Sequence, residues 1–332
     1  MASPLELARA WVDDGVVPGV AVCVVDGNGV LDELYAGVRT RDGDVPVDRA
    51  TRFALASLTK PLTAAASLAA VEEELLSLDD EVRDGFSLRH LLSHCSGLPA
   101  DAAELDGPLL DPPGTYRRYS NAGYALAARL VEQAAGMPFR EYLHGAVIEP
   151  LGLDASLGLE PGDASRTAIV REPGIWEDRE PFFNSPSFRA AALAESGGYA
   201  SARGYGGFLT CLLAGGRARG GALLARETVA DMLSTQFGAL PGTVAGVASW
   251  DACTWGLGLD VRGTREPHWT GSALAASANT HFGSSGTLAW IDRERGIGLV
   301  ALANRGSYSG WWSRPGGWAD LTAAVVAAFS AR

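Results

Sequence analysis

The sequence predicts a mixed α/β protein of the α+β type, in which an antiparallel sheet is flanked by N- and C-terminal helices and carries an inserted helical domain. Strand patterns occur near both ends of the 332-residue chain, and the middle is mostly helical. A hydrophobic content of 47% without any low-complexity block indicates a well-packed globular protein. We expect residues 1–55 and 246–332 to form the sheet domain and residues 56–245 the helical insert, with the active site in the cleft between them.

The predicted elements follow from periodicity and turn residues. Residues 4–15 have an amphipathic helical pattern. Two strands, 20–26 and 30–35, are joined by the tight turn Gly27-Asn28-Gly29. Further helices are expected at 62–74, 87–94, 121–135, after Pro138, and at 203–214, 226–235 and 318–329. Strands are expected at 254–260, 286–292 and 297–303.

Charge and composition exclude several classes of partner. The net charge of −12 and a pI near 4.9 argue against nucleic acid or an anionic membrane, which both attract basic surfaces. Charged residues interrupt the N-terminal segment where a signal peptide needs an apolar stretch, and no apolar run approaches the ~18 residues of a membrane span. We therefore expect a cytoplasmic protein that acts on a small molecule.

The cysteines do not form a metal or disulfide pattern. Cys23, Cys95, Cys211 and Cys253 are far apart and show no C-x-x-C spacing. We expect buried free thiols.

The only lysine in the chain, Lys60, lies three residues after Ser57, although all 26 other basic residues are arginine. A lysine can lose its proton and act as a base, whereas arginine stays charged. Pro61 is tolerated only in the first turn of a helix, so Ser57 and Lys60 should share one face there, where the helix dipole favours a neutral amine. This arrangement is typical of an activated nucleophile, although a chance pairing of two common residue types would look the same.

Two other triplets stand out. Tyr119-Ser120-Asn121 precedes a predicted helix, and His281-Phe282-Gly283 precedes a predicted strand. With Ser57-Leu-Thr-Lys60, they resemble the S-x-x-K, Y-x-N and H-x-G motifs of the serine β-lactamase and penicillin-binding superfamily, in its class C branch, which includes DD-peptidases and family VIII carboxylesterases. The resemblance covers about the whole chain and implies the β-lactamase/transpeptidase-like fold.

The resemblance also implies roles. Ser57 would be the nucleophile, and Lys60 with Tyr119 would take its proton and return it to the leaving group. The sequence leaves open whether Lys60 or Tyr119 holds that proton. Asn121 would donate to the substrate carbonyl or hold Lys60 in place.

The third motif would complete the site. Backbone N–H groups of Ser57 and Ser284 would form the oxyanion hole, and Gly283 would allow the substrate to approach closely. Many β-lactamases carry lysine where this chain has His281. Because imidazole is only partly charged at neutral pH, His281 favours neutral esters or amides over a carboxylate-bearing antibiotic. A histidine that merely bonds a strand edge is the alternative.

These observations favour a serine hydrolase without cofactor or metal, first of all a carboxylesterase. A β-lactamase or D-amino-acid peptidase is the second interpretation, and a non-catalytic penicillin-binding or sensor domain is an alternative of another class. A metal-dependent hydrolase is disfavoured because His90 and His94, at i and i+4, lack an H-E-x-x-H pattern or a nearby third ligand. No G-x-S-x-G elbow occurs.

Two aromatic groups could line an acyl pocket or simply pack in the core. They are Trp176, Phe182, Phe183 and Phe188, and Tyr308, Trp311, Trp312 and Trp318.

Overall fold

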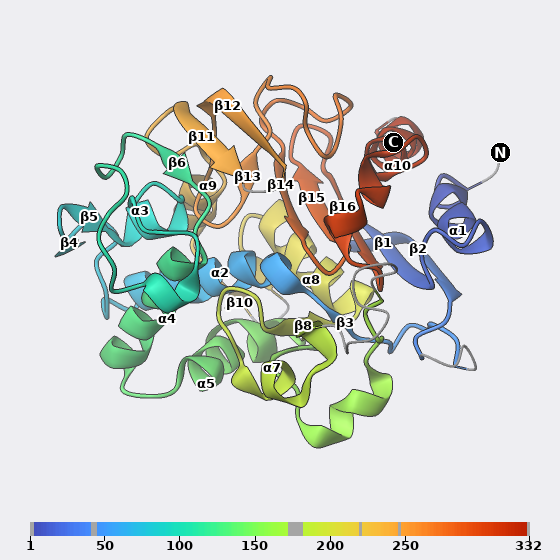
Figure 1. The fold of residues 1–332 in the computed structure, drawn as a ribbon, viewed down its shortest axis with the longest axis horizontal. Coiled ribbons are helices and arrows are strands. Elements are labelled where there is room, and N and C mark those ends of the chain that lie inside the picture. The colour runs from blue at the N-terminus through green and yellow to red at the C-terminus, as the bar shows by residue number, and fades with distance from the viewer. Residues whose placement is uncertain (1–2, 41–44, 172–181, 219–220, 245–246, 331–332) are drawn as a thin grey trace.

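A computed structural model of the chain describes residues 3–40, 45–171, 182–218, 221–244 and 247–330. Its largest sheet has six strands in the order β13-β14-β15-β16-β1-β2, and all neighbours are antiparallel. The N-terminal strands are β1 (Gly19–Asp26) and β2 (Gly29–Gly37). The C-terminal ones are β13 (Asp260–Val261), β14 (Asn279–Gly283), β15 (Thr287–Asp292) and β16 (Ile297–Ala303). Because β1 pairs with β16, both ends of the chain meet in one sheet (Figure 1). This confirms the prediction of an antiparallel sheet built from strands near both ends.

Helices cover both faces of this sheet. Helices α1 (Glu6–Asp13) and α10 (Trp318–Phe329) lie side by side on one face, and α8 (Ala202–Leu213) covers the other, with α2 (Thr59–Glu72) beyond it (Figure 1). Strand β1 is buried on both faces. Its odd-numbered residues from 21 to 25 belong to the core with α2 and α8, and its even-numbered residues from 20 to 24 to the core with α1 and α10. This two-sided burial explains its unbroken apolar sequence.

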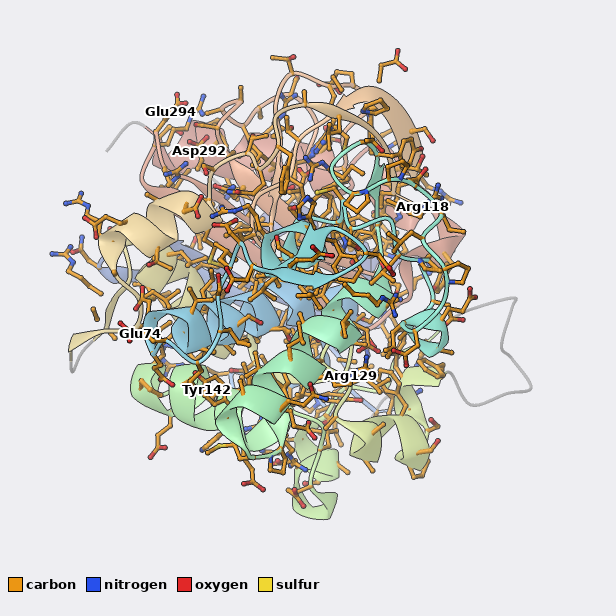
Figure 2. All side chains as sticks on the ribbon, turned by 90° about the vertical axis from the view of Figure 1, so that its left-hand side faces the viewer. Glu74, Arg118, Arg129, Tyr142, Asp292 and Glu294 are labelled. Carbon is orange, nitrogen blue, oxygen red and sulfur yellow. The ribbon has the colours of Figure 1, made fainter. Side chains whose placement is uncertain are left out.

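The middle of the chain forms the helical layer. It contains α2, α3 (Leu88–Leu92), α4 (Asn121–Ala135), α5 (Phe139–Leu143), α6 (Glu149–Leu151), α7 (Pro186–Ala191) and α9 (Arg226–Met232). In Figure 2, Arg129 and Tyr142 mark this layer, whereas Asp292 and Glu294 lie on the side of the large sheet. The bounds of α4 and α10 agree with the predicted ranges.

The middle range is not entirely helical, because small sheets join its loops. One has the order β3-β8-β7, and another has the order β12-β11-β6. Their bounds are β3 (Phe53–Ala54), β6 (Arg117–Arg118), β7 (Ala155–Leu157), β8 (Gly198–Ala200), β11 (Leu240–Val244) and β12 (Ala248–Cys253). Two further pairs are β4 (Glu81–Arg83) with β5 (Phe86–Ser87), and β9 (Arg217–Ala218) with β10 (Gly221–Ala222).

Helix α8 falls in the range expected for the helical insert, yet it packs against β1 and β16. Gly206 permits this contact, since a Cβ there would lie 3.1 Å from Cys23 Sγ. This helix therefore belongs to the layer that covers the sheet. The division of the chain at residues 56 and 245 stays a prediction.

The predicted strand at 254–260 is wrong. Beyond β12 the chain turns back, and Trp255 forms an isolated bridge with Asp260. Gly258 has a φ of +100°, and a Cβ there would lie 2.5 Å from Ala64 Cβ. Glycine therefore permits a turn that presses against helix α2, where an extended strand could not fit.

Two further predictions concern the chain as a whole. All four cysteines are free and buried, as expected. Within the described ranges, no helix is both long and apolar enough to cross a bilayer.

Candidate active site

Ser57 lies in a tight turn that leads directly into helix α2. Residues 56–58 form one turn of 3-10 helix. Ala56 has a φ of +48°, a left-handed conformation that is strained for a residue with a side chain. Pro61 lies in the first turn of α2, as predicted. The turn leaves Ser57 half-buried while Ala56 is fully buried.

Strand β14 packs closely against this turn. A Cβ on Gly283 would lie 2.2 Å from the Leu55 carbonyl oxygen, so only glycine fits. We expected Gly283 to make room for the substrate, but the structure shows that it makes room for the protein's own backbone. Two side chains beyond the strand hold the contact: Ser285 Oγ donates to the Ala54 carbonyl at 2.6 Å, and Thr287 Oγ1 donates to the Leu55 carbonyl at 3.0 Å.

Ser284 begins the turn after β14. Its carbonyl accepts a hydrogen bond from the Ser307 N–H at 2.8 Å. Because Ser285 is tied to strand β3, which precedes Ser57, Ser284 is held beside the Ser57 turn. Its N–H group stays a candidate for the oxyanion site, together with that of Ser57.

Lys60 is completely buried one helical turn after Ser57. Its Nζ makes three hydrogen bonds: to Ser57 Oγ at 3.1 Å, to Asn121 Oδ1 at 2.7 Å and to the Glu195 carbonyl oxygen at 2.8 Å. Burial lowers the pKa of Lys60 to about 7, and the charge of Glu195 opposes that shift. The amine is therefore poised to lose its proton near neutral pH while it touches the Ser57 hydroxyl.

Tyr119 and Asn121, around the start of helix α4, also contact the Nζ group of Lys60. Asn121 begins helix α4, and the Ser120 side chain caps that helix by accepting from the Gly123 N–H. Of the two roles expected for Asn121, the contact with Lys60 is present, because its Oδ1 accepts from Lys60 Nζ. Donation by its side-chain N–H to a substrate carbonyl stays a prediction. The Tyr119 ring centroid lies 4.8 Å from Lys60 Nζ.

Tyr119 holds its proton tightly. Burial raises the pKa of Tyr119, and the neighbouring Ser57 hydroxyl offsets only part of the rise. Its hydroxyl makes no hydrogen bond of ordinary geometry with the described residues. The pKa of Lys60 is lowered and that of Tyr119 is raised, so the neutral amine beside a protonated phenol is favoured over an ammonium beside a phenolate.

His281 lies on β14 and is buried. Its Nδ1 lies 2.9 Å from the Phe282 carbonyl oxygen and donates to it, which leaves Nε2 as an acceptor without a partner in the described structure. Burial, and then the charge of Lys60, lower the pKa of His281 to about 3. The third motif therefore presents a neutral imidazole at physiological pH.

Sequence reasoning missed the side chains that hold the Tyr119 ring. His94 stacks on it with ring centroids 4.3 Å apart, and Trp255 meets it edge-on at 5.8 Å. His94 Nδ1 also accepts from the Ser120 N–H at 3.0 Å, and so it fixes the loop between Tyr119 and helix α4. His94 has a φ of +60°, a left-handed conformation outside helix α3. Helix periodicity does not predict this conformation, and so it did not predict the contact with Tyr119.

His90 and His94, the two histidines spaced four residues apart, contact different parts of the chain. His90 Nδ1 accepts from the Ser87 N–H at 3.1 Å, and its ring stacks on Phe237, whereas His94 faces Tyr119. Among the residues that the structure describes, no group of three or more His, Cys, Asp or Glu side chains could hold a metal ion.

The two predicted aromatic groups lie in different parts of the structure. Phe183 and Phe188 share an apolar cluster with Ala54 and Ala56, the residue before Ser57, and Phe182 is exposed beside them. Trp176 lies outside the described residues. Trp311 and Trp318 are instead packed in the core with helix α1, Trp312 stacks on Trp318, and Tyr308 is exposed.

Proteins of known family and structure resemble this chain over most of its length. The sequence model of the β-lactamase family matches residues 6–310. The chain belongs to the β-lactamase family. A β-lactamase structure from Mycobacterium bovis is 31% identical, with a TM-score of 0.77 over 99% of this chain and 100% of that one. A family VIII carboxylesterase shares the fold, at 18% identity and a TM-score of 0.78 over 97% and 96% of the two chains.

Curated members of the β-lactamase family include esterases and penicillin-binding proteins. Esterase EstB from Burkholderia gladioli is 26% identical over 354 residues, which cover 86% of this chain and 85% of that protein. The chain spans about a third to a half of the first penicillin-binding proteins that it matches, namely 36% of one from Bacillus subtilis and 48% of one from Amycolatopsis lactamdurans. The predicted resemblance and the mixed α/β fold are confirmed.

Replacing Lys60 by methionine should change how stability depends on pH. Unfolded lysine keeps its proton up to a pKa of about 10.4, whereas the pKa of buried Lys60 is about 7. Between these values the unfolded state binds more protons, so the stability of the wild type rises with pH. Methionine does not titrate, so Lys60→Met lacks this rise. The free energy of unfolding of Lys60→Met minus that of the wild type should therefore fall, by an amount on the order of 4 kcal/mol, as the pH rises through this window.

Urea unfolding of both proteins across that pH window measures this difference. Ser67→Ala, on the same helix, is the control and should follow the wild type at every pH. Parallel pH dependences of the wild type and Lys60→Met would show that Lys60 has an ordinary pKa in the folded protein.

Proposed function

We propose that the protein is a serine hydrolase that works through a covalent acyl-enzyme on small esters or amides, most simply as a carboxylesterase. The observation that carries the proposal is the 3.1 Å contact between Ser57 Oγ and the Nζ of the only lysine. That lysine is fully buried, and its pKa is lowered to about 7. A neutral amine in hydrogen-bond contact with a hydroxyl is a general base in position.

In the proposed mechanism, Ser57 Oγ attacks the substrate carbonyl and Lys60 Nζ accepts the serine proton. The backbone N–H groups of Ser57 and Ser284 stabilise the oxyanion. Tyr119, which holds its proton, donates it to the leaving-group oxygen or nitrogen and regains one from the Lys60 ammonium. Water then attacks the acyl-enzyme, the same groups carry its proton in reverse, and Ser57 is released with a carboxylic acid as product.

His281 supports a neutral substrate. An imidazole that is uncharged at physiological pH offers no cation to a carboxylate, in contrast to lysine in the third motif. Ala56, the residue before Ser57, belongs to an apolar cluster with Phe183 and Phe188, so we expect this side of the site to accept an apolar acyl group. Both observations favour the esterase interpretation over a β-lactamase or D-amino-acid peptidase.

Replacing Ser57 by alanine should lower the hydrolysis of a p-nitrophenyl ester by roughly 10³-fold or more, because the nucleophile is lost. It should also abolish labelling by a fluorophosphonate. Ser67→Ala is the matched control, since Ser67 is a buried serine of helix α2 whose Oγ donates to the Thr63 carbonyl at 2.9 Å. Undiminished turnover by Ser57→Ala would rule out the mechanism.

A substrate panel should rank the alternatives. We expect short acyl esters to exceed nitrocefin and D-alanyl amides by roughly tenfold or more in kcat/KM. The carboxylate of nitrocefin finds no cation in a neutral third motif, and an alkoxide or phenoxide leaves more readily than an amine. Preference for nitrocefin or D-alanyl amides would reverse this order in favour of a β-lactamase or peptidase. Stoichiometric labelling without turnover would indicate a binding or sensor domain, and loss of activity on chelation would indicate a metal enzyme.

A further inference from the structure

Glu195 lies in the turn between α7 and β8, which is fastened along the first turns of helix α2. Three hydrogen bonds hold this turn. Lys60 Nζ donates to the Glu195 carbonyl at 2.8 Å, and Thr63 Oγ1 donates to the Ala194 carbonyl at 2.6 Å. The Gly198 N–H donates to Thr59 Oγ1 at 2.8 Å. The position of Glu195 relative to Lys60 is therefore fixed by the backbone.

The side chain of Glu195 is unusual for a carboxylate. The residue is only 5% exposed, and the one hydrogen bond that its carboxylate makes within the described structure comes from Ser196 Oγ, at 3.4 Å. It takes part in none of the ion pairs closer than 4.0 Å that the described residues form. A buried carboxylate that lacks a contacting cation is costly, so its retention beside the only lysine calls for a reason.

The other groups around Lys60 do not supply a negative charge. Tyr119 and Tyr124 face the Nζ group with their rings, and burial raises the pKa of both phenols. Burial lowers the pKa of His281 and of His94, so both imidazoles are neutral at physiological pH. Ser57 and Asn121 complete the surroundings as neutral hydrogen-bond partners. Glu195, by contrast, is an acidic residue whose own backbone carbonyl contacts Nζ, and its charge raises the pKa of Lys60.

We propose that Glu195 is a positioning residue that sets the proton affinity of Lys60, so that its buried carboxylate determines the pH range in which Lys60 acts as the base. The inference rests on the proposed function in so far as Lys60 is that base. Burial drives the proton off Lys60, and the Glu195 charge draws it back. Without this charge, the amine would be neutral at lower pH.

The test replaces Glu195 by glutamine, which keeps the shape and removes the charge. The midpoint of the Lys60 titration should fall by about one pH unit, the size expected on removal of one nearby charge in a protein interior. Because Lys60 is the only lysine, biosynthetic labelling with ε-¹³C-lysine gives one NMR resonance that reports this titration directly. The acid limb of the kcat/KM profile should move down by the same amount.

Two further variants keep the test decisive. Ser196→Ala removes the hydroxyl that bonds Glu195 without changing charge, and its midpoint should equal that of the wild type. Glu195→Ala is a second neutral variant, for use if Glu195→Gln does not fold, and should show the same downward shift. An unchanged Lys60 midpoint in either folded neutral variant overturns the proposal, whatever happens to the melting temperature.

The two readouts separate this inference from the proposed function. The NMR titration needs no turnover, so it stands even if Ser57→Ala were to keep full activity. If the resonance shifts while the kcat/KM profile does not, Glu195 tunes Lys60 but Lys60 is not the base, and the link to catalysis is overturned.

Discussion

The burial of one lysine amine is the constraint on which the rest of the site depends. An ammonium removed from water must find partners or lose its proton. Lys60 has three hydrogen-bond partners, and its pKa is also lowered to about 7. Its three hydrogen bonds come from three separate parts of the chain, namely the nucleophile turn, the start of α4 and the turn before β8. We expect a change in any of these parts to alter both the position and the protonation of Lys60.

The sheet and the helical layer bring these parts together. Strand β14 can approach the nucleophile turn only because Gly283 lacks a Cβ, and the side chains of Ser285 and Thr287 hold it there. The strained backbone of Ala56 is kept in place by this packing. On the opposite side, His94 and Trp255 clamp the Tyr119 ring. The site is thus assembled from long-range contacts around a short, rigid turn.

The sequence predicts the elements that have a strong local signal. The two-sided apolar run of β1, the Gly-Asn-Gly turn and the capped start of α4 each determine their own structure. The first two motifs identify Ser57, Tyr119 and Asn121, which meet at Lys60. It does not predict contacts made by main-chain groups. Every residue has a carbonyl, so residue type does not reveal that Glu195 bonds Lys60. The segment 254–260 has the sequence pattern of a strand, but its packing against α2 bends it.

The central claim is that Ser57 carries the acyl group during turnover. Brief reaction with a short-chain p-nitrophenyl ester, acid quenching and tryptic digestion should give a mass increase of one acyl group on the peptide 53–83, with fragmentation that assigns it to Ser57. An unmodified Ser57, or the acyl group on another residue while the ester is being consumed, would contradict the account.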